Sequence, residues 1–306
     1  MENYLREYLE SVGIVDGITA SSLSCEVCGC DDNPVLVREV ETHAGCFTEL
    51  PVTGCGHCGF LFQNPRFNKS FYETYYNKYY RLMMFGDTQP EKDFLVDQVR
   101  RGEYLCRYLA DVLPPAGRML DVGCSAGGLM VPFARRGWSV LGTDPDIGYA
   151  EFGNRRLGLE IQAVAAEDMV LPDGEFDLVI ITGSLEHVFD VNRVLEICRR
   201  ASKPDGLLLV EGRAFGYGIM KGCFSHNHRR YLTATSTELL MLKHGWAPVW
   251  STSEAICGPT RPGAVYVLGR ASAPLGREQL ESAIGDGRRD DLASLRERLA
   301  SMKGAR

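Results

Sequence analysis

Short runs of aliphatic and β-branched residues alternate with segments of helical period through the middle of the chain. Five such runs predict buried strands: one ends at Asp121, one ends at Asp144, and three span residues 160–165, 176–183 and 207–211. A helical pattern over 191–201 is stopped by a Lys-Pro-Asp-Gly turn. Strands that alternate with helices in this way predict a doubly wound sheet, whose ligand lies at the carboxyl ends of the strands.

The flanking segments complete the expected sheet. Apolar residues recur at a helical period over 91–113, which predicts a helix that packs on the sheet and ends at a Pro-Pro pair. Residues 246–253 and 263–269 predict a closing antiparallel pair of strands. The polar, Arg-rich segment 273–306 predicts a helix over 290–302, either solvated or in an oligomer contact.

The loop after the first strand limits which class of ligand the fold can bind. A dinucleotide fold needs the G-x-G-x-x-G pattern so that the backbone can close on a pyrophosphate. Here Ser125 stands at the second glycine position and Asp121 precedes the loop. An acid there repels a pyrophosphate, which disfavours an NAD-linked oxidoreductase, but it suits a ligand with an amino group and a sulfonium. Asp144, at the end of the second strand, suits the ribose hydroxyls.

These motifs resemble the class I S-adenosylmethionine (SAM) methyltransferases over residues 111–270. The resemblance implies an α/β, Rossmann-like, seven-stranded domain. It also implies that Asp168 accepts from the adenine amino group and that Met169 packs on the adenine ring. The expected cofactor-binding residues are Asp121, Gly123, Ser125, Gly127, Asp144, Pro145, Glu167, Asp168, Met169, Gly183 and Ser184.

The composition is that of a globular chain with room for two domains. Hydrophobic residues make up 45% of the 306 residues and charged residues 24%, as in a soluble protein. The sequence contains no 18-residue apolar run and no signal-peptide pattern at its start, so we expect a cytoplasmic protein without a membrane partner. A net charge of −7 argues against nucleic acid, although a local basic patch could escape this average.

Six of the eleven cysteines lie between Cys25 and Cys58. Without a secretion signal, they indicate a metal site or free thiols rather than disulfides. Two C-x-x-C pairs, Cys25 with Cys28 and Cys55 with Cys58, can supply four thiolates to a zinc ion. The 26 residues between the pairs predict an inserted hairpin over 35–50. The module resembles a small zinc ribbon.

This zinc site is expected to be structural. Four thiolate ligands leave no open position for catalysis, and a module of this size has too little core to fold alone. Cys30, Cys46 and His57 are spare candidates for the ligand set. A group of free structural or redox cysteines is the alternative.

Residues 71–80 contain five tyrosines, more hydroxyl groups than a helix core needs. The segment is either a half-exposed connecting helix or a lid over the cofactor and acceptor. Cysteine pairs, a Gln-Asn-Pro-Arg turn over 63–66 and a Tyr-rich segment, all before the SAM domain, resemble the sugar C-methyltransferases of bacterial polysaccharide and antibiotic pathways.

A His-x-His pattern after the fifth strand adds to this second resemblance. It implies that His228 is the catalytic base, helped by His187 after the fourth strand and by Tyr79 or Tyr80 from the lid. From the residues alone, His228 is equally a loop histidine that caps backbone groups, and His187 a core or helix-cap histidine.

Two features depart from that family. Ser225 and Asn227 replace its tyrosine and glutamate, and the chain ends soon after residue 270, where those enzymes carry a further α/β domain. We therefore expect methyl transfer to a hydroxyl oxygen of a sugar or similar polar acceptor, with sugar C-methylation as the first alternative. Arg229 and Arg230 are either solvated or meet a phosphate of a nucleotide-linked acceptor.

Two further alternatives stay open. The first is an RNA methyltransferase whose zinc ribbon captures RNA, against which stand six acidic residues within the ribbon. The second is a non-catalytic SAM-binding subunit, against which stand the two strand-end acids and both histidines. We expect a small-molecule partner, free or nucleotide-linked, and leave the oligomeric state open. The expected divisions are an N-terminal helix with the zinc module (1–66), a lid with linking helices (67–113), the SAM domain (114–272) and a tail (273–306).

Overall fold

The computed structural model describes residues 22–43, 46–212, 224–261 and 263–303, together with Glu7, Leu9 and Glu10. The side chains of residues 43, 46, 47 and 300–303 are not part of this description. Most of the expected N-terminal helix and the glycine-rich segment 213–222 therefore lie outside the described residues.

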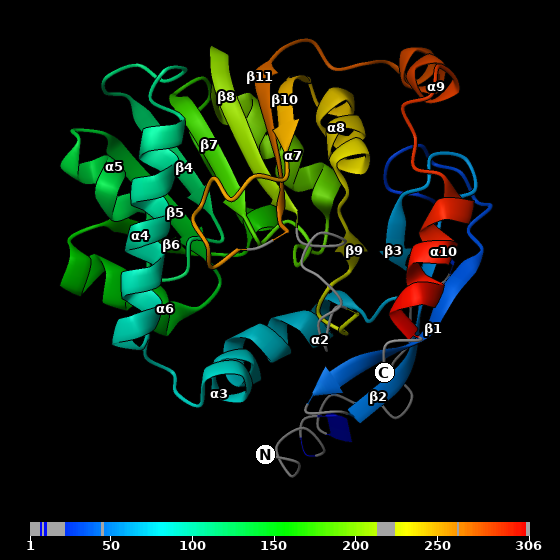
Figure 1. The fold of residues 1–306 in the computed structure, drawn as a ribbon. Helices are drawn as coiled ribbons and strands as arrows, with labels where there is room; N and C mark the ends of the chain where they lie inside the picture. Colours follow the sequence, from blue (N-terminus) through cyan, green and yellow to red (C-terminus); the bar gives the residue numbers. More distant parts are fainter. Residues whose placement is uncertain are drawn as a thin grey trace.

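A large sheet forms the centre of the molecule (Figure 1). Its strand order is β10-β11-β8-β7-β4-β5-β6, in which β4 to β8 run parallel and β11 and β10 close the sheet antiparallel. The strands are β4 (Arg118–Val122), β5 (Ser139–Asp144), β6 (Glu160–Ala163), β7 (Phe176–Thr182), β8 (Ser202–Gly212), β10 (Trp246–Thr252) and β11 (Val265–Ala271). The predicted α/β fold is confirmed.

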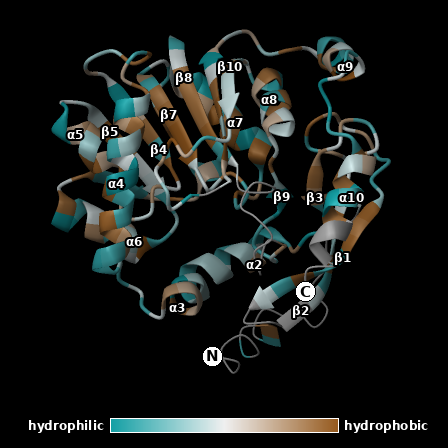
Figure 2. Cartoon of the chain, in the orientation of Figure 1, coloured by the Kyte–Doolittle hydropathy of each residue, from teal (hydrophilic) through white to brown (hydrophobic). Residues whose placement is uncertain are grey.

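Helices cover both faces of this sheet because its central strands are apolar along their length; β7 and β8 are largely brown in Figure 2. In β7, Leu178 and Ile180 pack with one helix layer, and Val179 and Ile181 pack with the other. The first layer holds α4 (Lys92–Tyr108), α5 (Val131–Arg135) and α6 (Ile147–Phe152); the second holds α7 (Val191–Ala201), α8 (Ala234–Lys243) and α9 (Arg277–Gly285). Short 3₁₀ turns at Gly128–Met130 and Ala166–Asp168 and a π-helical turn at Gly153–Leu157 connect these elements.

A small antiparallel sheet carries the cysteine pairs. Its order is β1-β2-β3-β9, with β1 (Val35–His43), β2 (Cys46–Gly54), β3 (Leu61–Gln63) and β9 (Arg230–Tyr231). The predicted hairpin is β1 and β2. The fourth strand, β9, follows β8 of the large sheet in the chain, so the chain passes from the large sheet back into the small one. The predicted domain boundaries stay a prediction.

The C-terminal helix α10 (Leu292–Lys303) packs beside the small sheet (Figure 1). Leu295 and Leu299 are 4% and 6% exposed and contact the same cluster as Val40 and Leu50. The tail therefore contributes a buried face within its own chain.

The Tyr-rich segment crosses from the small sheet beneath the large one (Figure 1). It consists of α2 (Lys69–Thr74), a π-helical turn (Tyr75–Tyr79) and α3 (Tyr80–Phe85). Asn68 caps α2 by accepting from the amide of Phe71 at 2.9 Å. Across the described part of the chain, every helix is too short or too polar to cross a membrane.

Candidate functional site

A cavity of about 580 Å³ lies between the large sheet and the Tyr-rich segment. One wall comes from the loops that follow β4, β5, β6 and β7, and the other from residues 69–85. These loops follow the carboxyl ends of parallel strands, where ligands of doubly wound folds bind.

The loop after β4 folds around Asp144. Gly123 and Gly127 have φ of 76° and 79°, and Ser125 takes φ 58°, which is uncommon for a residue with a Cβ. This conformation lets the amide of Ser125 donate to Asp144 Oδ2 at 2.8 Å. The amide of Asp146 donates to Oδ1 at 3.0 Å. Asp144 therefore holds both its own loop and the glycine loop.

Asp121 is a buried acid, only 1% exposed, at the base of this loop. Its Oδ1 has no hydrogen-bond partner among the described residues. Burial raises the pKa of Asp121 to about 7, against the opposing effect of Arg101. A buried carboxylate with an unmet acceptor atom suits a cationic group of a ligand.

Arg81 from α3 lies over Asp144 and was not predicted from the sequence. Its Nη2 is 3.6 Å from Asp144 Oδ1 and donates to Ser125 Oγ at 3.3 Å, and its Nε donates to Asp146 Oδ2 at 3.2 Å. The guanidinium also stacks 3.8 Å from the centre of the Tyr149 ring. A ribose at Asp144 would meet this arginine.

The structure brings most of the expected cofactor residues together. Seven line the cavity: Gly123, Ser125, Asp144, Pro145, Glu167, Gly183 and Ser184. Asp121 and Gly127 are buried next to the lining. Asp168 and Met169 lie elsewhere, because the 3₁₀ turn points Asp168 to Lys69 at 3.1 Å and buries Met169 against the Thr143 hydroxyl at 3.3 Å.

The two candidate bases are neighbours. The ring centres of His187 and His228 are 4.7 Å apart, and a carboxylate oxygen of Glu186 lies within 4.8 Å of a nitrogen of each ring. Residues of these types could hold a metal ion or exchange a proton. His187 lines the cavity, whereas His228 is half-buried behind the lining.

Hydrogen bonding fixes the tautomer of His187. Its Nδ1 is 2.9 Å from the carbonyl oxygen of Asn227 and 3.0 Å from the hydroxyl of Tyr76. A carbonyl oxygen only accepts, so Nδ1 must carry the proton, and Nε2 of the neutral ring keeps the lone pair. The tyrosine that reaches the histidines is Tyr76; Tyr80 also lines the cavity, and Tyr79 is half-buried outside the lining.

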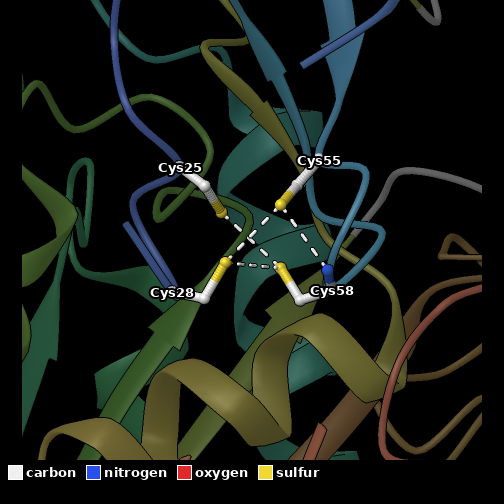
Figure 3. Close-up of side chains that lie close together, drawn as sticks. All are labelled: Cys25, Cys28, Cys55 and Cys58. Atoms are coloured by element: carbon white, nitrogen blue, oxygen red, sulfur yellow. Dashed lines mark hydrogen bonds between the residues drawn. The ribbon is translucent and has the colours of Figure 1, made fainter. Parts of the chain in front are cut away.

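Four cysteine thiols point to one centre (Figure 3). The sulfur atoms of Cys25 and Cys58 are 3.6 Å apart, those of Cys28 and Cys55 3.5 Å, and those of Cys28 and Cys58 3.6 Å. Thiolates arranged tetrahedrally around zinc, with bonds of about 2.3 Å, would be separated by about 3.8 Å. The cluster therefore fits a zinc ion closely.

The spare candidates fall outside this cluster. His57 pairs with Glu281 of α9 at 2.6 Å, and the Cys30 thiol points to a backbone carbonyl at 4.0 Å. The side chain of Cys46 is not among those described. The structure therefore groups the four residues that the C-x-x-C spacing predicts.

The comparisons with known proteins agree with this geometry. Residues 120–210 match a family model described as a methyltransferase domain. A ubiquinone biosynthesis O-methyltransferase from Rhizobium etli is 38% identical over 98 residues, which are 30% of this chain and 40% of that protein. One from Bradyrhizobium is 38% identical over 100 residues, 30% of this chain and 38% of that protein. The chain spans about two fifths of the length of these curated relatives.

Solved structures give a more distant likeness. A SAM-dependent methyltransferase from Thermotoga maritima, described as a possible histamine N-methyltransferase, has a TM-score of 0.45 at 20% identity and covers 58% of this chain and 93% of its own. A 1,6-didemethyltoxoflavin N1-methyltransferase from Burkholderia thailandensis has a TM-score of 0.46 at 18% identity and covers 60% and 82%.

Proposed function

We propose that this chain, which contains a class I SAM-dependent methyltransferase domain, methylates a hydroxyl oxygen of a small polar acceptor. The observation that carries the proposal is the placement of His187 on the wall of the same cavity as the glycine loop and Asp144. A sugar, free or nucleotide-linked, is the acceptor class that the sequence resemblance favours.

The chain's own residues fit the cofactor. The unmet oxygen of Asp121 suits the amino group and the sulfonium, and Asp144 suits the ribose. When bound, SAM supplies an electrophilic methyl group and leaves as a neutral thioether, so no strong general acid is needed at the sulfur. Arg81 would have to share Asp144 with the ribose or move away from it.

The remaining chemical requirement is removal of a proton from the acceptor. His187 is the proposed base, because it lines the cavity and its proton-bearing Nδ1 leaves the lone pair on Nε2. Glu186 and His228 lie close enough to stabilise the imidazolium that forms. The motif resemblance favours His228 as the base instead, so the two histidines are to be compared directly.

Zinc is proposed as a structural ion of the small module, held by Cys25, Cys28, Cys55 and Cys58. The four thiolates would fill its coordination sphere, so it takes no part in methyl transfer. The Glu186, His187 and His228 group could also hold a metal, but a histidine base needs none.

Oxygen is the proposed methyl acceptor for two reasons. The relatives that match over the SAM domain are named O-methyltransferases. The tyrosine and glutamate that accompany the base in the sugar C-methyltransferases are Ser225 and Asn227 here. The RNA alternative is less favoured because Asp31, Asp32, Glu39 and Glu49 are exposed on the cysteine module, where they repel phosphates.

The test is turnover of SAM with a panel of free sugars, nucleotide-linked sugars and hydroxylated aromatic acids, with mass spectrometry and NMR locating the new methyl group. His187→Gln is expected to lower turnover at least a hundredfold with SAM affinity within about threefold of wild type. His57→Gln, which lies away from the cavity, is the matched control.

Each contrary result has a defined meaning. Near-normal turnover in His187→Gln with a large loss in His228→Gln would transfer the base to His228. A methyl group found on carbon would replace the oxygen assignment with C-methylation. SAM binding without turnover on any acceptor would favour the non-catalytic subunit.

A further inference from the structure

Arg229 is one of two adjacent arginines that the structure separates clearly. Arg230 is fully buried and sealed in place: it pairs with Glu26 at 2.8 Å and donates to the carbonyls of Leu185 and Val188 at 2.8 and 2.7 Å. Arg229 is 1% exposed, yet its side chain lines the cavity. Arg230 is therefore a structural ion-pair partner, whereas Arg229 is placed where it can meet a ligand.

The backbone of Arg229 is held on both sides. Its amide donates to the carbonyl of Glu186, and its own carbonyl accepts from the amide of Gln63 in β3, both at 2.9 Å. Its guanidinium stacks 3.4 Å from the centre of the Tyr72 ring and 5.6 Å from that of Phe189. The cation is thus fixed in position between two aromatic rings before any ligand arrives.

No carboxylate of the described residues pairs with this guanidinium, and its Nε and Nη1 have no hydrogen-bond partner there. Burial lowers the pKa of Arg229, and the neighbouring cations Arg230 and Arg66 lower it further. A buried cation without a counter-ion is costly unless an anion completes the site.

The other cations on the cavity wall already have their partners. Arg81 pairs with Asp146, Lys69 with Asp168, and Arg101 with Glu211, at 3.2, 3.1 and 3.0 Å. Arg261 also pairs with Glu211, at 3.7 Å. Arg229 is the exception in this group.

We propose that Arg229 binds an oxyanion of the acceptor, a carboxylate or a phosphate, and so selects anionic acceptors for methylation. This inference rests on the proposed function and adds the substrate class. The unmet N–H groups at Nε and Nη1 lie on different edges of the planar guanidinium, and each can donate a charge-assisted hydrogen bond to an oxyanion.

The position of Arg229 assigns the anion to the acceptor rather than to SAM. Arg229 directly follows His228, and the carbonyl of the preceding Asn227 fixes His187. Its ring contacts are Tyr72 of α2 and Phe189, whereas the groups assigned to the ribose and to the glycine loop, Asp144 and Ser125, lie at the end of β5 and after β4. The oxyanion would therefore be held beside the proposed base.

The experiment measures anion binding without requiring turnover. Full-length, zinc-loaded protein saturated with S-adenosylhomocysteine is titrated with pyrophosphate, inorganic phosphate and succinate, and binding is followed by ligand-observed NMR. Wild type is expected to bind at least one of these probes, and Arg229→Met to weaken it about tenfold or more. The preferred probe distinguishes a phosphate from a carboxylate acceptor.

Lys69→Met is the matched control, because it removes one positive charge from the same wall but from a side chain that is exposed and already paired. It is expected to stay within about threefold of wild type. Arg229→Lys, which keeps the charge without the planar fork, should give intermediate binding, and circular dichroism with thermal unfolding reports whether each variant is folded.

Three results would overturn the assignment. The first is that the wild-type protein binds none of the probes. The second is that Arg229→Met binds them as tightly as the wild type does. The third is that folded Arg229→Met loses affinity for S-adenosylhomocysteine, which would place the cofactor carboxylate, rather than an acceptor anion, at Arg229. In a turnover assay the second result would appear as methylation of anionic acceptors with unchanged efficiency in Arg229→Met, which would reject the anion assignment while leaving methyl transfer intact.

Discussion

The ionisation of Asp121, a single buried carboxyl, is coupled to ligand binding. Burial raises the pKa of this carboxyl to about 7, so the folded protein binds a proton more tightly there than the unfolded chain does. As pH rises from about 4 to about 7, this group therefore lowers the free energy of unfolding. A cationic ligand offsets the cost of ionising this buried carboxyl, because the ligand binds the ionised form of Asp121.

Asp121→Asn is expected to weaken SAM binding about tenfold or more at neutral pH and to abolish its pH dependence. In wild type, affinity should fall by up to about tenfold for each pH unit below about 7, since protonation removes the counter-charge. Calorimetric titration with SAM between pH 5.5 and 7 checks both. Asp173→Asn, an exposed change of the same charge, is the control. An undiminished slope in Asp121→Asn would contradict the role of Asp121.

The sequence pointed to the strand-end acids and to Tyr80 of the lid but missed Tyr76 and Arg81, and the reason is local. Asp121 and Asp144 follow aliphatic runs, so the pattern fixes where they end. Tyr76 depends instead on a π-helical turn at Tyr75–Tyr79, which inserts a residue into the helical register and shifts which tyrosine meets His187. The position of Arg81 is set by packing between distant segments, which a local pattern does not encode. The sequence named Arg229 and Arg230 as possible phosphate contacts, but only packing decides which of the two lines the cavity.

At the level of elements, Glu26 ties the first cysteine pair to the small sheet and, through Arg230, to the carbonyls of Leu185 and Val188 after β7. Glu26 lies between Cys25 and Cys28, and its carboxylate pairs with Arg66 at 3.1 Å and with Arg230 of β9 at 2.8 Å. Burial alone would raise the pKa of Glu26, but the two guanidinium groups outweigh it and lower the pKa to about 2. The pair is buried, so its loss leaves two cations without a counter-charge.

Glu26→Gln is expected to lower the free energy of unfolding by about 3–5 kcal/mol at neutral pH. Urea denaturation of the zinc-loaded protein measures it. Glu73→Gln is the control, since its partner Lys69 is exposed and 3.7 Å away, and such pairs contribute about 1 kcal/mol or less. Equal stabilities for the two variants would mean that Glu26 does not anchor the module.

Helices and strands whose own sequence carries a hydrophobic pattern could be predicted. Short strands that form only because a neighbouring strand pairs with them could not. The strands of the large sheet carry aliphatic runs, and the helical pattern over 91–113 became α4. Strand β9 has two residues and β3 three, too short for any periodicity. The docking of α10 was equally hidden, because its polar composition gives little sign of the buried Leu295 and Leu299.

At the scale of the whole molecule, the two walls of the cavity come from different parts of the fold. The large sheet supplies the loop around Asp144, whereas the chain that follows β3 of the small sheet supplies Lys69, Tyr72 and Tyr76. Strand β9 pairs with β3, so Arg229 and His228 are positioned through the small sheet as well. The cysteine cluster should therefore matter more for the acceptor than for SAM.

Cys58→Ser is expected to lose zinc and at least about tenfold of kcat/KM while SAM affinity changes less than about threefold, because only the acceptor wall depends on the small sheet. Zinc by mass spectrometry, SAM binding by calorimetry and turnover are measured on one preparation. Cys30→Ser, nearby but outside the cluster, should keep the metal and the activity. If SAM affinity fell in step with turnover, zinc would be supporting the whole fold, and the division of the cavity into two separately supported walls would be wrong.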